Sequence, residues 1–283
     1  MKSLKSLFIS TFISLAVFTT GMALWELFTG GGWPWAVLLL TCAPSVGFFS
    51  YLFVWKPART SENLPTVFWT TLLGTLAVIS LALAGQACVV MVSLALLNLT
   101  GVHAYIRWYS RYGTREANVA LGEPLPAVTF TNLEGKPVTV ADYAGKPMVM
   151  LFFRGNWCPL CMAQIREVAA QYQSLQDQGV RVALISPQSH SQSADLAKQF
   201  QVDFEYLRDD DNQAARALGI VDAGGTPAGL EALGYDSDTV MPTVFIVDAE
   251  GRLVYQHLTD NYRVRPEPGL FIQVLREKGL IDG

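Results

Sequence analysis

The sequence is poor in charged side chains. They make up 16% of its 283 residues, whereas hydrophobic residues make up 51%. An ordinary soluble domain carries about 25% charged residues, so this composition argues against a wholly soluble protein. The shortage is concentrated before residue 110, where long apolar runs separate a few basic residues. The chain therefore divides into an apolar N-terminal part and a C-terminal part of ordinary composition.

The sequence also lacks the marks of a nucleotide-binding or nucleic-acid-binding protein. It has no glycine-rich phosphate loop of the usual spacing. The residues after 116 hold thirteen Lys or Arg against twenty-one Asp or Glu, a net charge of −8. A nucleic-acid partner would need a basic face, which this acidic half does not provide. We therefore expect no nucleic-acid partner.

Histidine and cysteine are scarce, with three and four residues respectively. A structural zinc site needs four ligands, and only His190 and His257 accompany Cys158 and Cys161 in the C-terminal half, at no recognisable spacing. We therefore predict no metal site and no organic cofactor. Cys42 and Cys88 fall in or beside apolar segments, and we interpret both as ordinary small apolar residues.

Four apolar segments are long enough to cross a hydrocarbon core of about 30 Å at 1.5 Å per helical residue. They predict four transmembrane helices, joined by short loops, in a membrane domain at residues 1–110 with a linker at 111–120. The segments run approximately over residues 4–28, 33–55, 66–84 and 87–105.

Basic residues occupy alternate loops of the predicted membrane domain. Lys and Arg are retained on the cytoplasmic side of short loops. Their positions therefore predict that the N-terminus and everything after residue 107 lie in the cytoplasm, and that the helices cross an inner or plasma membrane. A rival interpretation treats residues 1–23 as a cleaved signal peptide, which would leave the C-terminal domain on the same side. The basic residues are Lys2, Lys5, Lys56, Arg59, Arg107, Arg111 and Arg115.

Beyond residue 121 the sequence alternates between short apolar runs and helical periodicity. This pattern predicts an α/β domain at residues 121–283, with a parallel core and an antiparallel edge. We expect a hairpin at 127–140, strands at 148–153, 180–185, 204–207, 244–247 and 253–257, and helices at about 160–178, 193–201, 212–218 and 269–278.

A Cys-x-x-Cys motif, Cys158-Pro159-Leu160-Cys161, follows the first of these core strands and opens a helix. A thiol at a helix N-terminus is stabilised as a thiolate by the macrodipole and by unpaired backbone N–H groups. We therefore predict that Cys158 is the nucleophile. Cys161 lies one helical turn further on, where it can attack a mixed disulfide on Cys158, and we predict that it is the resolving residue.

Several motifs together resemble the thioredoxin superfamily, in its alkyl hydroperoxide reductase and thiol-specific antioxidant (redoxin, peroxiredoxin-like) group. The resemblance covers residues 118–283 and implies a thioredoxin-like fold and a thiol oxidoreductase activity. The motifs are Gly135-Lys136-Pro137, Gly145-Lys146-Pro147, the run Phe153-Arg154-Gly155-Asn156-Trp157 before the cysteines, and Met241-Pro242-Thr243 before a strand.

The same resemblance implies supporting roles around the cysteines for Trp157, Arg154 and Pro159. It further implies that Met241-Pro242, followed by Thr243, is a cis peptide that faces the pair, where the backbone of Met241 binds substrate. Glycines and prolines in residues 222–242 suggest a mobile loop beside the site.

Three positions depart from the family patterns. Peroxiredoxins have a threonine three residues before the reactive cysteine and an arginine ahead of the later strand, where this chain has Gly155 and Pro242. Thioredoxins have a buried aspartate six residues before the first cysteine, where this chain has Phe152. Proton transfer would then need water, Glu205 or Asp209.

These departures favour a membrane-anchored thiol–disulfide oxidoreductase that cycles between dithiol and disulfide. Its substrate would be a disulfide or a hydroperoxide, and its electrons would come from a thioredoxin-like protein or a low-molecular-weight thiol. Two alternatives stay open: a peroxiredoxin-like antioxidant that passes through a sulfenic acid, and a non-enzymatic membrane redox sensor.

Overall fold

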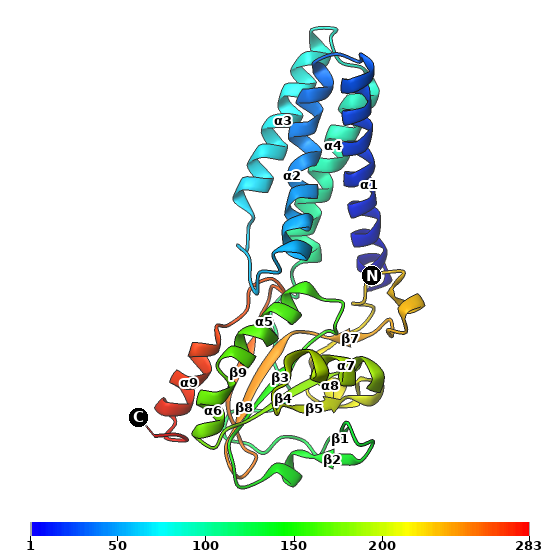
Figure 1. The fold of residues 1–283 in the computed structure, drawn as a ribbon. Helices are drawn as coiled ribbons and strands as arrows, with labels where there is room; N and C mark the ends of the chain where they lie inside the picture. The colour runs from blue at the N-terminus through cyan, green and yellow to red at the C-terminus, as the bar shows by residue number, and fades with distance from the viewer. Residues whose placement is uncertain (1, 283) are drawn as a thin grey trace.

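The computed structural model describes residues 2–282, so Met1 and Gly283, the outer ends of the two predicted domains, lie outside the described residues. A bundle of four long helices stands on an α/β domain, and the described start of the chain lies where the bundle meets that domain (Figure 1). The predicted fold class, an apolar four-helix part followed by a thioredoxin-like α/β part, is confirmed.

All four bundle helices are long and apolar enough to cross a membrane by length and composition. Their ends agree with the predicted segments to within a few residues, because glycine, proline and charged residues interrupt the apolar runs at those points. A π-helical turn, Tyr105–Tyr109, extends the last helix toward the α/β domain. The helices are α1 (Lys2–Thr29), α2 (Pro34–Val54), α3 (Pro65–Leu83) and α4 (Val89–Ala104).

Small residues set the helix spacing inside the bundle. A Cβ atom at Gly74 would lie 2.8 Å from the backbone carbon of Leu40, and one at Gly101 would overlap the ring of Phe12. In an apolar surrounding such close contact is a main source of helix association. These glycines therefore bring α3 against α2 and α4 against α1.

The α/β domain is built on a seven-stranded sheet with the order β2-β1-β5-β4-β3-β8-β9. β3, β4 and β5 are mutually parallel, whereas β8, β9 and the β1–β2 hairpin pair antiparallel, as the sequence predicts. The strands are β1 (Thr129–Thr131), β2 (Pro137–Thr139), β3 (Met148–Phe152), β4 (Arg181–Ser186), β5 (Glu205–Arg208), β8 (Thr243–Val247) and β9 (Leu253–Leu258); β6 (Val221–Asp222) and β7 (Thr239–Val240) form a separate pair.

Helices cover both faces of the sheet, and β3 is buried on both sides as its continuous apolar run predicts. The helix expected from residue 160 to 178 is interrupted at Gln171, which leaves the helical conformation, so two helices replace one. The helices are α5 (Pro159–Ala170), α6 (Tyr172–Asp177), α7 (His190–Phe200), α8 (Gln213–Ala217) and α9 (Pro268–Glu277).

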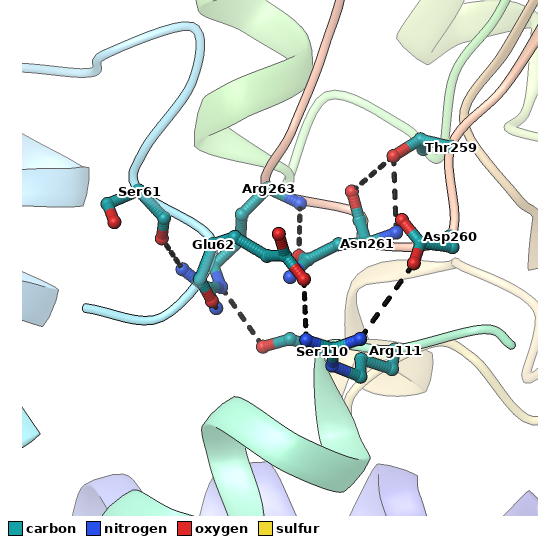
Figure 2. Close-up of polar contacts among 8 residues, drawn as sticks. All are labelled: Ser61, Glu62, Ser110, Arg111, Thr259, Asp260, Asn261 and Arg263. Atoms are coloured by element: carbon teal, nitrogen blue, oxygen red, sulfur yellow. Dashed lines mark hydrogen bonds and ion pairs between the residues drawn. The ribbon is translucent and has the colours of Figure 1, made fainter. Parts of the chain in front are cut away.

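A loop between β9 and α9, residues 259–267 and here called the junction loop, joins the two parts of the molecule. Its Arg263 is fully buried and donates to Ser110 Oγ at 3.0 Å, at the end of the bundle. It also donates to the carbonyl oxygens of Ser61 and Glu62 at 2.6 and 2.8 Å, in the α2–α3 loop. Figure 2 shows these contacts, with the Arg111–Glu62 ion pair beside them.

Replacing Arg263 by alanine is expected to lower the free energy of unfolding by about 3 kcal/mol, because several buried acceptors lose a charged donor at once. The melting temperature of the detergent-solubilised full chain measures this loss. Arg276→Ala, an exposed arginine on α9, is the matched control and should melt close to wild type. Equal melting of the two variants would show that the junction loop does not hold the two parts together.

Candidate functional site

The chain places the two cysteines at the junction of a core strand and a helix. β3 ends at Phe152, and α5 begins at Pro159, whose fixed φ suits the first helical turn. Cys158 is the N-cap residue of α5, and Cys161 lies in the first turn. Both are present as thiols and are almost fully buried. The predicted helix N-terminal position of Cys158 is confirmed.

Arg265, in the junction loop, lies against both sulfur atoms. Its Nη2 is 3.4 Å from Cys161 Sγ and 3.8 Å from Cys158 Sγ. Arg265 is only 4% exposed, and Gln164 on α5 and the carbonyl of Tyr262 accept the other hydrogen bonds of its guanidinium. A buried cation thus faces the dithiol at a distance at which it stabilises a negative charge on either sulfur.

The dithiol ionises as a coupled pair. Burial opposes ionisation of Cys161, but a hydrogen bond from Cys158 and the charges of Arg265 and Arg154 outweigh it and lower the pKa of Cys161 to about 5. Burial, followed by that same neighbouring thiolate, raises the pKa of Cys158. The dithiol therefore titrates as a pair that favours one negative charge, and the directions of the two shifts favour Cys161, whereas the sequence predicted a lowered pKa for Cys158.

A cavity of about 230 Å³ opens beside Cys158, between the α/β domain and the ends of α1 and α2. Cys158 lines it, whereas Cys161 does not. An incoming reagent in this cavity meets Cys158 first, which fits the predicted roles of the two cysteines. Its lining is Ile9, Ser10, Ile13, Phe49, Leu52, Phe53, Tyr109, Arg154, Trp157, Cys158, Pro159, Leu160, Pro227, Ala228, Leu230 and Tyr262.

Arg154 and Trp157, both singled out from the sequence, lie together on the wall of this cavity. The guanidinium of Arg154 stacks over the Trp157 ring at 4.7 Å and donates to the carbonyl of Gly225. Asp222 provides a counter-charge at 3.6 Å. Arg154 therefore fixes the 222–242 loop beside the site, where the sequence placed it, and contributes positive charge near Cys158.

Pro242 and Thr243, which follow Met241, lie beside Arg265. Pro242 and Thr243 line a small cavity together with Arg265. Every peptide bond among residues 2–282 is trans, so the expected cis peptide at Pro242 is not found. The N–H of Met241 donates to the carbonyl of Ile220 at 2.8 Å, and the expected substrate contact of Met241 stays a prediction.

Gly155, which replaces the threonine of peroxiredoxins, has a φ of +142°. A Cβ atom there would lie 2.8 Å from Nε1 of Trp157. Glycine is required here for two reasons. The backbone has a positive φ, and the indole ring of Trp157 occupies the space that a Cβ atom would need. A threonine hydroxyl in the usual peroxide-binding position has no room in this arrangement.

We expect Gly155→Thr to lower the free energy of unfolding by about 1–3 kcal/mol without raising the rate of reaction with hydrogen peroxide. Gly145→Thr is the matched control, since Gly145 has a φ of +91° and a Cβ atom added there would meet no other atom within 4 Å. Gly145→Thr should show the backbone strain without the clash, and should therefore lower the free energy of unfolding by less than Gly155→Thr does. Faster peroxide reduction by Gly155→Thr would contradict the steric argument.

The two acidic residues considered as proton acceptors are used elsewhere. Asp209 accepts from the backbone N–H groups of Ala214 and Ala215, both at 2.8 Å, and so caps α8. Glu205 pairs with Arg181 at 3.1 Å across the sheet. Neither contacts the cysteines. Cys158 can instead exchange its proton with Cys161, since the two are coupled.

Arg265 is the site residue that sequence reasoning missed. It lies about a hundred positions beyond the cysteines, in a loop, and no spacing rule links it to them. The only local signal was the pair Arg263 and Arg265 around a valine in an otherwise uncharged run, residues 261–266. Two arginines so placed in a loop are ordinarily solvent-exposed, and burial became evident only from the fold.

Comparison with known proteins identifies the C-terminal part. Residues 121–256 match the model of the AhpC/TSA family. Among curated relatives, the chain is 29% identical over 130 residues to chloroplastic peroxiredoxin Q of Sedum lineare, covering 46% of this chain and 70% of that protein. It is 24% identical over 149 residues to thiol-disulfide oxidoreductase ResA of Bacillus thuringiensis subsp. konkukian, covering 52% and 75% respectively.

Among solved structures, AhpC of Enterococcus faecalis aligns with a TM-score of 0.47 and 21% identity over 57% of this chain and 94% of its own. The family match ends at residue 256, so the junction loop and α9 lie beyond it. Residues 121–256 are thus an AhpC/TSA-family redoxin domain, carried behind four apolar helices, and the protein is a thiol oxidoreductase.

Proposed function

We propose that the protein is a membrane-anchored thiol–disulfide oxidoreductase that works through the Cys158–Cys161 pair. The observation that carries the proposal is the position of Arg265, a buried cation within 3.8 Å of both sulfur atoms. Such a cation keeps one thiolate present at neutral pH, and the thiolate is the reactive form in disulfide exchange.

The catalytic cycle follows from the positions of the two thiols. The Cys158 thiolate, formed when its proton passes to Cys161, attacks one sulfur of a substrate disulfide, and the other substrate sulfur leaves as a thiolate. Cys161 then loses its proton and attacks Cys158, which releases the second substrate sulfur and leaves the Cys158–Cys161 disulfide. Two thiols from a small thiol pool or a thioredoxin-like protein return the pair to the reduced state.

We further propose that the α/β domain lies on the cytoplasmic side of an inner or plasma membrane. Arg59 in the α2–α3 loop donates to the carbonyl of Arg265, and after α4 Arg111 pairs with Asp260 and Arg115 donates to Thr243, so all three contact the α/β domain or its junction loop. The basic residues thus gather at the end of the bundle where the domain lies (Figure 1), and positive charge marks the cytoplasmic end of short loops.

A peroxiredoxin-like activity is the second candidate, and the AhpC/TSA match favours it. Against it, Gly155 and Pro242 replace the threonine and arginine that bind peroxide in that group. Arg265 can supply a guanidinium from another direction, so a slow reaction with peroxide is compatible with the site.

The deciding experiment compares two oxidants with the reduced, detergent-solubilised full chain. Loss of free thiol is followed after mixing with a model protein disulfide or with hydrogen peroxide at equal concentrations. The proposal expects faster loss with the disulfide. Faster loss with peroxide would instead make the protein a peroxidase that dispenses with the usual threonine and arginine.

A further inference from the structure

The cavity at Cys158 is walled partly by the membrane helices. Ile9, Ser10 and Ile13 of α1 and Phe49, Leu52 and Phe53 of α2 line it, opposite the redoxin residues. Phe53 is 56% exposed, so the lining continues onto the outer, apolar surface of the bundle. A reactive thiol that faces a soluble substrate would not need walls made of membrane-spanning helices.

The rest of the wall is held in place by α1. Ser6 Oγ donates to the carbonyl of Thr226 at 2.6 Å, and Ser10 Oγ donates to that of Ala228 at 2.9 Å. The backbone N–H of Ala228 in turn donates to the carbonyl of Ser6 at 3.2 Å. The 222–242 loop thereby forms one wall of the cavity, and the apolar side chains of α1 and α2 form the opposite wall.

Two hydrogen-bond donors on the lining side chains lack a partner among residues 2–282. They are Nε of Arg154 and Nε1 of Trp157, and neither atom reaches solvent. The Arg154 side chain is 96% buried, at 4% exposure. Buried unpaired donors are costly, and a ligand in the cavity that brings an oxygen acceptor to the Arg154 guanidinium would lower that cost, whereas Nε1 of Trp157 lies beside Gly155 and Tyr235.

We propose that this cavity binds the head group of a membrane-dissolved quinone, which takes electrons from the Cys158–Cys161 pair. This inference rests on the proposed dithiol chemistry, and it identifies a quinone as the oxidant of the dithiol. A volume of about 230 Å³ is smaller than the roughly 300 Å³ of a typical drug-sized site, so it holds a ring but not a long tail. The tail would lie along α1 and α2 in the lipid.

The reaction balances with two electrons. The Cys158 thiolate adds to a ring carbon, and Cys161 then attacks the Cys158 sulfur, so the sulfur–carbon bond breaks and its electron pair passes to the ring. One proton of the resulting quinol comes from the dithiol and one from solvent. The sulfurs are oxidised to a disulfide, the quinone is reduced, and the thiol donor regenerates the dithiol.

Two features favour a quinone over a hydroperoxide as the membrane-dissolved oxidant. Gly155 and Pro242 replace the peroxide-binding pair, so a peroxide oxygen would lack its usual partners. The lining also contains aromatic rings from both halves, among them Trp157, Tyr109 and Tyr262. Flat rings pack well against such a surface.

The test uses the reduced full chain in phospholipid nanodiscs without oxygen, mixed with a benzoquinone that carries a ten-carbon tail. Quinol formation and thiol loss are followed together. We expect one quinol for each pair of thiols lost, at a rate at least tenfold above that of Cys158→Ser. Ile13→Trp and Leu52→Trp fill the cavity and should slow the reaction at least tenfold, whereas Leu73→Trp, on the exposed face of α3, should not.

A binding measurement covers the case in which a filled variant fails to fold. The tailed quinone should raise the melting temperature of Cys158→Ser, which keeps the cavity but cannot react. No quinol from a wild type that still exchanges with a protein disulfide would overturn the quinone site and leave the proposed function standing. Faster consumption of a fatty-acid hydroperoxide than of quinone would also overturn it. Loss of both reactions would sink the dithiol mechanism itself.

Discussion

Replacing Cys158 by serine is expected to stop disulfide exchange, with a rate loss on the order of a thousandfold or more. A serine hydroxyl does not ionise near neutral pH, so no nucleophile faces the cavity, and Cys161 does not line it. The measurement is the rate at which the reduced full chain loses free thiol to a model protein disulfide. Cys88→Ser, at an exposed position before α4, is the matched control and should react like wild type.

Cys161→Ser separates the two steps of the same reaction. Cys158 can still attack, but no second thiol releases the substrate, so a covalent mixed disulfide should accumulate and be visible by mass spectrometry. Burial still raises the pKa of Cys158 in this variant, but the further rise caused by Cys161 is gone, so the first step should not slow. A trapped adduct on Cys161 in the Cys158→Ser variant, with none on Cys158 in the Cys161→Ser variant, would reverse the assigned roles.

The sequence predicted the parts of this molecule whose signals are local. Apolar runs of helix length, bounded by glycine, proline and basic residues, marked α1 to α4, and the continuous run at β3 marked a strand buried on both faces. The Cys-x-x-Cys spacing after that strand predicted the N-cap position of Cys158. In each case one short segment contains the whole physical cause.

What the sequence did not predict depends on contacts between distant segments. Arg265 reaches the sulfur atoms, and Arg263 reaches the α2–α3 loop, only because the junction loop crosses between the two parts of the molecule. The lowered pKa of Cys161 has partly the same origin, since the charge of Arg265 adds to the hydrogen bond from Cys158 in lowering it. The use of Asp209 as a cap of α8 likewise followed from the fold.

The junction loop joins the membrane bundle to the dithiol through two neighbouring arginines. Arg263 is held by Ser110 and the α2–α3 loop, and Arg265 follows two residues later against the sulfurs. A displacement of the bundle that moves Arg263 would therefore move Arg265 as well. Oxidation of the dithiol removes the thiolate that Arg265 faces, and this weakens the hydrogen bond between Arg265 and the sulfur atoms.

Arg265→Ala is expected to shift the pH dependence of the reaction more than any other change at the site. In the wild type, Cys161 ionises with a pKa of about 5, so the reaction rate should be flat from about pH 6.5 upward. Without the guanidinium the pKa of Cys161 rises, although the hydrogen bond from Cys158 and the charge of Arg154 still lower it. A smaller share of the pairs then holds a thiolate at pH 7, and the rate there should fall by up to roughly thirtyfold, the figure for a thiol with the ordinary pKa of about 8.5. The greater basicity of the remaining thiolate offsets part of this loss.

The direction of this shift separates an electrostatic role of Arg265 from a merely structural one. Because the variant lacks only the charge that favours ionisation, its rate should climb with pH and approach the wild-type value above the raised pKa. Arg265→Lys keeps a cation and should lie between the two, with a smaller displacement of the pH profile. A variant equally slow at every pH would instead mean that Arg265 holds the loop in place and that the thiolate is stabilised by Arg154 and the N-terminus of α5.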